Sequence, residues 1–419
     1  MLNQQLEHSV ENFISRLKRR QVIGSYEVAK ETAVILRQAV STTRWRDVDT
    51  LIDTITELGG RLAAAQPKEL AVGNIVRRVL KVIREVARGE LKTNTGEEGG
   101  EDFEEDFEED FGDDDGFEQD EDDEDDEGED NKLNIQRSHL NNNTVQSSNA
   151  SSNVGSVVGN DRSTLSIQSS MFHLLSDASK IREFGNEVEQ KSIYKLKPLI
   201  IQEINEEIIA DLESVYKGIS DQAIDYIHAN EVIMTIGKSR TVQEFLVRAA
   251  KTRKFQVIVA ETSPTYQGHD MAAALSAAGI DTTVMVDSAI FAAMPRVNKV
   301  VIGAHAVLAN GGLVAVTGSH LIAAAAKHHS TPVLVCTALY KLSPLFAYDV
   351  DAFNITVAPN SIMNFQEGAI IDKISLSNPY YDYVSPELVN LFVHNLGSAP
   401  PTYVYRLIND NYDPEDTTL

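Results

Sequence analysis

Apolar residues recur along the first 92 residues at spacings of three and four, the period of an α-helix with one buried face. We expect one helix to end at Gly59-Gly60 and another to start near Pro67 and end at Gly89. Helices with a single apolar stripe have to pack on one another. The sequence therefore predicts an N-terminal helical bundle. The positions predicted to face inward are Val10, Phe13, Ile14 and Leu17, then Trp45, Val48, Ile52 and Ile55, and then Ile75, Val79, Val82, Ile83 and Val86.

At Glu231 the period changes, and short segments that are apolar throughout alternate with helical ones. Strands that are apolar on both faces are typical of parallel sheets covered by helices. The alternation predicts an α/β fold over residues 231–419, with a Rossmann-like, doubly wound parallel sheet. The predicted strands are "EVIMTIG", "FQVIVAE", "TTVMVD", "KVVIGA" and "TPVLVCT".

Neither period occurs in residues 93–165. Between Glu97 and Asp130 there are 24 acidic residues and no Lys or Arg, so the formal net charge of −26 falls to −2 for the rest of the chain, with 39 acids against 37 bases. So much like charge, followed by an Asn/Ser tract, predicts a disordered insertion. Two roles stay open: a solubilising loop, or a tract that binds basic partners with Phe103, Phe107 and Phe111 as anchors.

The helical signal returns from about Ser166. A helix starting near Pro198 is predicted to complete the bundle and to lead into the α/β domain over residues 166–230. Its inward positions are Ile201, Ile204, Ile208, Leu212 and Val215.

Composition disfavours several classes of protein. A single cysteine, Cys336, excludes an intrachain disulfide, fits a reducing compartment and is interpreted as a buried apolar residue. The N-terminus lacks the apolar core and cleavage site of a secretory signal. The uncharged run Val300–Ala326 is broken by glycines and polar residues that predict strand, turn and helix, not a membrane span. We therefore expect a soluble, cytosolic protein with no membrane partner.

One predicted helix of the bundle carries a basic cluster. It consists of Arg77, Arg78, Lys81, Arg84 and Arg88. Such a cluster is either a solvated face or a surface that binds a partner. Nucleic acid is disfavoured as a direct partner, because no basic stripe with interleaved aromatic residues occurs.

Candidate ligand-binding residues follow the predicted strands, because open parallel sheets bind ligands beyond the carboxyl ends of their strands. The turn after the first strand offers cations and a hydroxyl at a helix start, which suits an anion, but the P-loop pattern is incomplete because position 232 is Val. Dinucleotide-binding and metal-ligand spacings are absent, so we predict no cofactor and no metal. The candidates are Gly237, Lys238, Ser239, Arg240, Glu261, Thr262, Ser263, Pro264, Gly268, Gly303, His305, Asn310, Gly311 and Gly312.

Two segments at this predicted edge resemble a known family. "VIVAETSPTYQG" and "GAHAVLANGGLVAVTGSHLIAAAAKHHSTPVLVC" are similar to the C-terminal α/β domain of the regulatory subunits of initiation factor 2B. The same domain occurs in methylthioribose-1-phosphate and ribose-1,5-bisphosphate isomerases. "IMTIGKSRTVQEFL", "YKLSPLF" and "PPTYVYRLINDNYDPED" strengthen the resemblance, and the helical domain fits the same family. The acidic insertion does not belong to the family pattern.

The resemblance implies that the isomerase chemistry is lost. The isomerases move a proton between carbons with a cysteine and an aspartate, and those positions fall at Gly237 and His305 here. Their phosphate-binding arginine falls at Ser263. Each proton-transfer group contributes typically ~10²–10⁴-fold to a rate. A non-catalytic protein with a vestigial cleft is therefore expected.

The resemblance further implies a regulatory subunit of the factor 2B complex, which exchanges GDP for GTP on initiation factor 2. The expected partners are the other factor 2B subunits, delta most directly and also alpha, gamma and epsilon, and initiation factor 2, whose alpha subunit's phosphorylation the complex senses. Two alternatives remain: an active sugar-phosphate isomerase, and an acidic chaperone-like binder that acts through residues 97–130.

Overall fold

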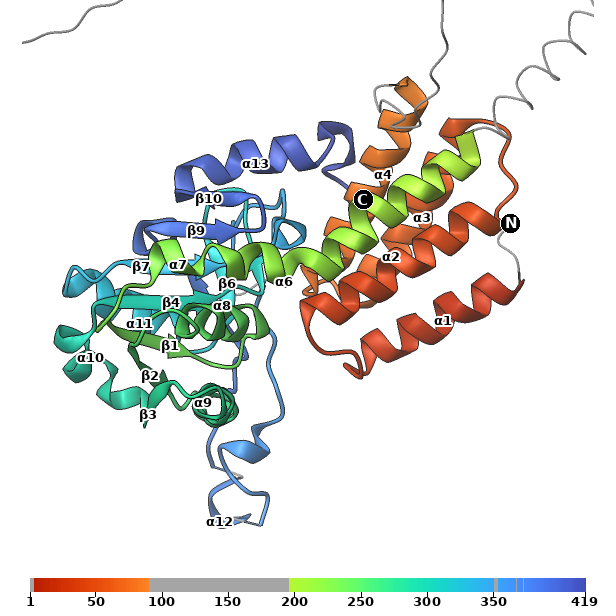
Figure 1. The fold of residues 1–419 in the computed structure, drawn as a ribbon. Coiled ribbons are helices and arrows are strands. Elements are labelled where there is room, and N and C mark those ends of the chain that lie inside the picture. The colour runs from red at the N-terminus through yellow and green to blue at the C-terminus, as the bar shows by residue number, and fades with distance from the viewer. Residues whose placement is uncertain (1–3, 90–195, 350–352, 367, 372) are drawn as a thin grey trace, which may run out of the picture. The chain divides into compact units, whose positions relative to one another are not determined.

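The structure is a computed structural model of the 419-residue chain, and it describes residues 4–89, 196–349, 353–366, 368–371 and 373–419. Figure 1 shows the arrangement of the elements. The insertion predicted over residues 93–165 and the first part of the predicted helical segment, residues 166–195, lie outside the described residues. Within the described part of the chain, no helix has both the length and the apolar character that crossing a bilayer requires.

The N-terminal helices form as their apolar stripes predict. In α1, all four residues predicted to face inward are buried, and so are all five in α4, whereas Val48 and Ile52 of the remaining stripe are only partly buried. The helices pack on one another and on a helical segment that follows the undescribed stretch. The elements are α1 (Gln4–Lys18), α2 (Ser25–Thr42), α3 (Val48–Ala65) and α4 (Leu70–Arg88), and then a helix over residues 196–203 that continues as η1 (Ile204–Ala210), a π-helix, α6 (Asp211–Asp221) and α7 (Ala223–Tyr226).

The prediction that Gly59-Gly60 ends a helix is wrong, because α3 continues to Ala65. A β-carbon at Gly59 would lie 2.4 Å from a methyl carbon of Val76 on α4. Gly59 therefore allows α3 and α4 to approach closely and does not cap a helix. The predicted start near Pro67 falls three residues before the observed start of α4 at Leu70.

All five predicted strands occur, and they pair in parallel. They are β1 (Val232–Ile236), β2 (Gln256–Ala260), β3 (Asp281–Met285), β4 (Lys299–Gly303) and β7 (Val333–Cys336). The seven-stranded sheet has the order β10-β9-β7-β4-β1-β2-β3. From β1 the chain builds outward through β2 to β3 and then returns to place β4 on the other side of β1. This reversal is the switch point of a doubly wound fold.

Helices link the parallel strands. They are α8 (Arg240–Ala250), α9 (Gln267–Ala277), α10 (Ile290–Ala293), flanked by the 3₁₀ turns η2 (Asp287–Ala289) and η3 (Met294–Arg296), and α11 (Ser319–His328). The uncharged run Val300–Ala326 contains most of β4 and most of α11, as predicted, and between them it also forms the unpredicted strands β5 and β6.

Several elements escaped prediction. β9 (Leu391–His394) pairs in parallel with β7, and β10 (Gly397–Ala399) pairs antiparallel with β9. A second sheet has the order β5-β6-β8, from β5 (Ala306–Val307), β6 (Leu313–Val316) and β8 (Tyr381–Val384). The remaining elements are α12 (Gly368–Ile371), α13 (Val404–Asn411) and the 3₁₀ turns η4 (Leu339–Lys341), η6 (Pro359–Ser361), η7 (Pro386–Leu388), η8 (Pro401–Tyr403) and η9 (Pro414–Asp416).

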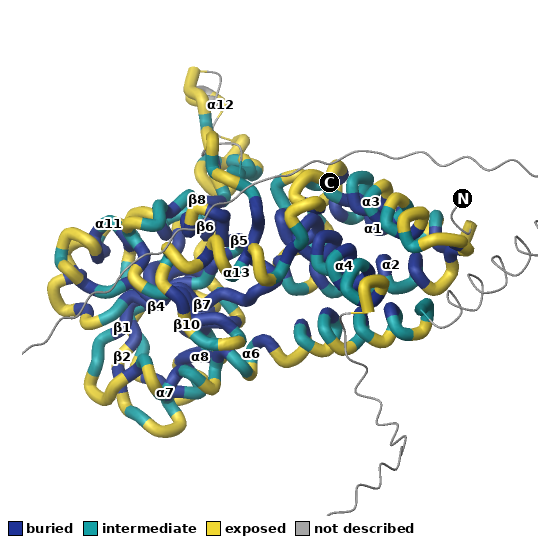
Figure 2. The backbone as a smooth tube through the Cα atoms, turned by 90° about the horizontal axis from the view of Figure 1, so that it is seen from above, coloured by how far each residue is buried: buried dark blue, intermediate teal, exposed yellow. Residues whose placement is uncertain are grey.

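Burial on both faces was predicted for every strand and is wrong for β3. This strand is the edge of the sheet, and all five of its residues are exposed or partly exposed. The central strands β1, β4 and β7 are buried, and Figure 2 shows this contrast between the interior and the exposed segment around α12.

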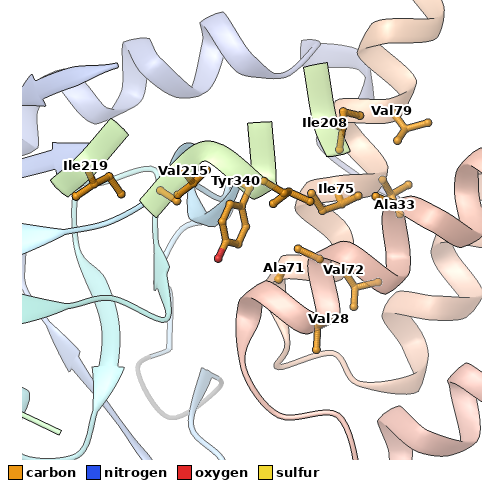
Figure 3. Close-up of a cluster of buried hydrophobic side chains, with 14 of the residues drawn as sticks. Val28, Ala33, Ala71, Val72, Ile75, Val79, Ile208, Val215, Ile219 and Tyr340 are labelled. Atoms are coloured by element: carbon orange, nitrogen blue, oxygen red, sulfur yellow. The ribbon is translucent and has the colours of Figure 1, made fainter. Parts of the chain in front are cut away.

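One apolar cluster joins the helices to the sheet. It contains residues of α1 to α4, of the helix over 196–221 and of strands β1, β2 and β4. Tyr340, on η4 beyond β7, belongs to the same cluster and is 1% exposed. In Figure 3 its ring stands between Val215 of α6 and the helices that carry Ile75 and Val28. The helices and the sheet therefore share a core.

Candidate functional site

A cleft of about 620 Å³ opens at the switch point of the sheet. Residues that follow β1 and β4 line it, as the rule for open parallel sheets predicts. The start of α2 contributes Ser25 and Tyr26, and β8 contributes Tyr381. Five of the predicted candidates line this cleft: Lys238, Ser239, Arg240, Gly303 and His305.

Three cations line the cleft, and two of them, Lys238 and Arg240, lie beside other side chains. The Lys238 ammonium lies 3.5 Å from the Asp270 carboxylate. The Arg240 guanidinium lies 4.5 Å from the ring centre of Tyr216 and 5.7 Å from that of Tyr26, which are cation–π distances. Both cations therefore have neighbours that lower their tendency to capture an anion.

Ser239 and Gly303 form a close structural contact. Ser239 is the N-cap of α8, and its hydroxyl accepts a hydrogen bond from the Val242 N–H at 3.4 Å. A β-carbon at Gly303 would lie 2.5 Å from the Ser239 hydroxyl oxygen. The absence of a side chain at Gly303 thus lets β4 pass the start of α8.

Gly237 stands where the isomerase resemblance places a cysteine. Its φ is +68°, in the left-handed region, and a β-carbon there would lie 2.8 Å from a methyl carbon of Val316. Its N–H donates to the Thr262 hydroxyl at 2.9 Å. This backbone has no room for a side chain, so Gly237 links two turns of the sheet edge.

The predicted residues Glu261, Thr262, Ser263, Pro264 and Gly268 form a tight turn beside the cleft and do not line it. The N–H groups of Thr262 and Ser263 donate to the Asp287 carboxylate at 2.9 and 2.6 Å. Adjacent backbone N–H groups of this kind commonly bind anions. Here the chain's own carboxylate takes that place, and Asp287, the last residue of the predicted strand "TTVMVD", was not among the predicted candidates.

A similar contact satisfies the start of α11. The N–H groups of Gly318 and His320 point to one carboxylate oxygen of Asp382, at 2.6 and 3.3 Å. Asn310, Gly311 and Gly312 form the turn between β5 and β6 and do not line the cleft. The Asn310 amide bonds to the Gly312 N–H and the Tyr383 hydroxyl.

His305 follows β4 and faces the helical bundle. Its Nε2 lies 3.3 Å from a carboxylate oxygen of Glu69, which precedes α4, and each side chain is 11% exposed. On its other side, Nδ1 lies 3.3 Å from the Tyr381 hydroxyl, and the two rings stack with centres 4.4 Å apart. Burial, together with the nearby charges of Lys341 and Arg20, lowers the pKa of His305 to about 3. The imidazole is therefore neutral near pH 7.

Two more buried groups complete this region. The Lys341 ammonium donates to the Ala304 carbonyl at 2.8 Å, and burial lowers its pKa to about 8. Cys336 is buried as predicted, and burial raises the pKa of its thiol to about 12. The thiol therefore stays protonated near neutral pH and is a poor nucleophile. Among the described residues, no group of three or more His, Cys, Asp or Glu side chains has the arrangement of a metal site.

The basic cluster of α4 is largely engaged within the chain. All five cations contact the segment around α13 and η9, the start of α6, or a neighbour on α4. The cluster is therefore not the solvated face that one interpretation predicted, and a role in binding a partner stays a prediction. The partners are the Asp416 and Thr417 carbonyls for Arg77, Asp211 for Arg78, Glu85 and the Asp410 carbonyl for Lys81, Glu415 and Asp416 for Arg84, and Asp413 for Arg88.

The arrangement matches known proteins along nearly the whole chain. A model of the Initiation factor 2 subunit family covers residues 21–401. The chain belongs to this family. Two relatives carry the name translation initiation factor eIF2B subunit beta. That of Schizosaccharomyces pombe is 40% identical over 427 residues, 99% of each chain, and that of Dictyostelium discoideum is 46% identical over 406 residues, 97% of this chain and 95% of the relative. The family predicted from the sequence is confirmed.

Solved structures of family members agree with the fold. eIF2B beta from Chaetomium thermophilum is 26% identical with a TM-score of 0.62, covering 99% of this chain and 93% of that one. A chain of the tetrameric eIF2B-beta2-delta2 complex from the same organism is 26% identical with a TM-score of 0.61, covering 98% of this chain and 96% of that one. The 5-methylthioribose 1-phosphate isomerase of Pyrococcus horikoshii, at 14% identity and a TM-score of 0.51 over 96% of this chain and 87% of that one, shares the fold alone.

The family pattern did not point to every residue that matters at this cleft. Glu69, Asp287, Lys341, Tyr381 and Asp382 were missed. A lone Glu in the first turn of a predicted helix reads as an ordinary first-turn acid. Only the fold brings Glu69 next to His305, which lies 236 positions further along the chain.

Proposed function

We propose that the chain is a non-catalytic regulatory subunit of the cytosolic eIF2B complex, which exchanges GDP for GTP on translation initiation factor 2. The observation that carries this proposal is the similarity to two proteins named eIF2B subunit beta, which covers at least 95% of this chain and of each relative. In this proposal another subunit carries the exchange chemistry. The chain contributes to assembly and to sensing whether the alpha subunit of factor 2 is phosphorylated.

The chemistry of the cleft supports a non-catalytic role. An isomerase of this fold needs a proton donor and a base on either side of its substrate. Gly237 has no side chain for the first role. His305 lines the cleft, but its two ring nitrogens lie beside Glu69 and Tyr381. The Cys336 thiol is buried and offers no replacement.

The closed anion sites support the same conclusion. A sugar phosphate needs free N–H groups or free cations. At two turns of the sheet edge, the carboxylates of Asp287 and Asp382 already accept those N–H groups. The three cations that line the cleft have partners as well: Asp270 for Lys238, the Tyr216 ring for Arg240 and the Ala304 carbonyl for Lys341.

The proposed partners are the other eIF2B subunits, with delta the most direct, and initiation factor 2 through its alpha subunit. The beta2-delta2 assembly of the Chaetomium thermophilum relative supports the first part of this proposal. Regulation requires that phosphorylated and unmodified factor 2 bind with different affinity to different states or surfaces of the complex.

Reconstitution tests the regulatory role. eIF2B is assembled from its subunits with or without this chain, and release of fluorescent GDP from factor 2 is followed with and without phosphorylated alpha subunit. We expect omission of the chain to abolish inhibition by the phosphorylated form while the catalytic subunit retains basal exchange. Unchanged inhibition without the chain would refute the proposal.

Two controls separate the alternatives. Purified chain is assayed for aldose–ketose conversion of methylthioribose 1-phosphate and ribose 1,5-bisphosphate, and turnover that disappears in His305→Ala would establish an isomerase instead. A variant lacking residues 97–130 is tested for binding to the delta subunit. Retained binding is expected, whereas its loss would favour a protein that acts through the acidic insertion.

A further inference from the structure

The contact between Glu69 and His305 joins the two halves of the molecule at the cleft. Glu69 Oε1 and His305 Nε2 lie 3.3 Å apart, and neither atom makes a hydrogen bond of good geometry with another group of the described residues. Leaving two buried polar atoms unpaired is unfavourable. A small rotation that pairs them with each other is therefore favoured, and the pair needs only one proton.

The neighbouring residues hold this contact in place. Lys68 donates to the Asn354 carbonyl, and Leu70 packs in an apolar cluster with Leu308 and Tyr381. Further along α4, the Asn74 side chain donates to the Tyr340 carbonyl at 3.1 Å. The start of α4 is thus fixed to the sheet edge on both sides of Glu69.

The charges around the pair disfavour an imidazolium. Lys341, from η4, and Arg20, from the segment after α1, are the cations that act on His305. Tyr381 stacks on the ring, and Tyr380 packs edge-on against Tyr381. Burial raises the pKa of Glu69 to about 7, although the same two cations oppose the rise. Glu69 is therefore the group of this pair that takes up a proton near neutral pH.

A neutral imidazole can pair with Glu69 in two ways. When Glu69 is ionised, Nε2–H donates to its carboxylate, and Nδ1 accepts from the Tyr381 hydroxyl. When Glu69 is protonated, its O–H donates to Nε2, and Nδ1–H donates to the Tyr381 oxygen. Both forms keep two hydrogen bonds, and they differ by one proton on Glu69 and by the tautomer of the ring.

We propose that Tyr381, His305 and Glu69 form a relay that reverses the direction of its hydrogen bonds when Glu69 gains or loses one proton. The relay connects the start of α4 in the helical bundle with β4 and β8 at the cleft. A change in the surroundings of Glu69 is thereby transmitted to the Tyr381 hydroxyl without breaking the contact. This inference concerns the chain itself and does not depend on the proposed function.

Side-chain NMR of the full chain labelled with ¹⁵N-histidine tests the relay, because the ring nitrogens distinguish the two neutral tautomers and the imidazolium. His305→Gln identifies the His305 signals by their loss. The ratio of the Nε2–H to the Nδ1–H tautomer is expected to rise roughly 100-fold between about pH 6 and about pH 8, since each pH unit changes an ionisation ratio tenfold. Glu69→Gln should abolish this dependence.

Glu27→Gln is the matched control, because Glu27 is exposed and lines the same cleft. It is expected to leave the pH dependence of the His305 tautomer ratio unchanged. Conversion of His305 to imidazolium within this pH range, or a tautomer that does not change with pH in the unmodified chain, would overturn the proposal. If a variant fails to fold, the pH dependence of the tautomer in the unmodified chain still decides the question. Neither the imidazolium nor the tautomer result bears on eIF2B assembly.

Discussion

Replacing Arg77 with methionine tests how strongly the basic residues of α4 hold the C-terminal segment. Arg77 is 5% exposed, and its guanidinium donates to the carbonyls of Asp416 and Thr417, both at 3.0 Å. Methionine keeps most of the apolar stem but donates no hydrogen bond. The substitution therefore leaves two carbonyls without their partner at the junction of the two halves.

The expected loss follows from these two bonds. A hydrogen bond to a charged group contributes about 1.5–3 kcal/mol, and a buried group left unpaired costs about 1–3 kcal/mol. We expect Arg77→Met to lower the free energy of unfolding by about 3–5 kcal/mol. Arg88→Met is the matched control on the same helix, because Arg88 is 51% exposed and 3.5 Å from Asp413. An exposed ion pair of this kind contributes about 0–1 kcal/mol.

Urea unfolding followed by tryptophan fluorescence measures both variants. Trp45 is the only tryptophan of the chain and is buried in the bundle, so its emission reports unfolding of that half. The unfolding free energies of the two variants are compared provided that both show the same dependence of that free energy on urea concentration. If Arg77→Met and Arg88→Met lost the same stability, the C-terminal segment would not be held by the buried contacts described above.

Two further predictions concern the cleft and the sheet edge. Glu69→Gln should be more stable than the unmodified chain by about 1–3 kcal/mol at pH 8, but not at pH 5. The folded pKa of the Glu69 carboxyl is raised from 4.5 to about 7, so the unmodified chain loses stability as pH rises through that range. Thermal unfolding at both pH values checks this, and an equal difference at both would contradict it. Gly268→Ala should destabilise by about 3 kcal/mol or more, because its β-carbon would lie 2.0 Å from the Ala260 carbonyl oxygen. Gly60→Ala, inside α3, should instead stabilise by up to ~1 kcal/mol, because a β-carbon there would meet no atom within 4 Å apart from its own stretch of helix. Thermal unfolding that ranked the two glycines equally would refute the reasoning.

The elements that could be predicted are those in which the spacing of apolar residues within the element itself indicates which side chains are buried. The stripe of α4 and the apolar segment of β4 each predict which side chains are buried without reference to the rest of the chain. Glycines were harder, because the same residue serves opposite purposes. Gly59 packs against Val76 on another helix, and no local signal distinguishes this from a helix end.

The site was predictable in position but only partly in composition. The strand order places a cleft after β1 and β4, so Lys238 and His305 were found. Asp287 was not, because its carboxylate reaches the turn at Thr262 only after the sheet has formed. The same holds for the basic cluster of α4, which the sequence shows as a row of charges and the fold shows as a set of contacts to distant acids.

The bundle is built from segments on both sides of the acidic insertion, and this has a practical consequence. Ile204, Ile208 and Leu212 are fully buried against the earlier helices. A protease that nicks the chain between residues 97 and 130 leaves both fragments with their share of this interface. The nicked protein should therefore run as two bands on a denaturing gel and still elute as one species under native conditions.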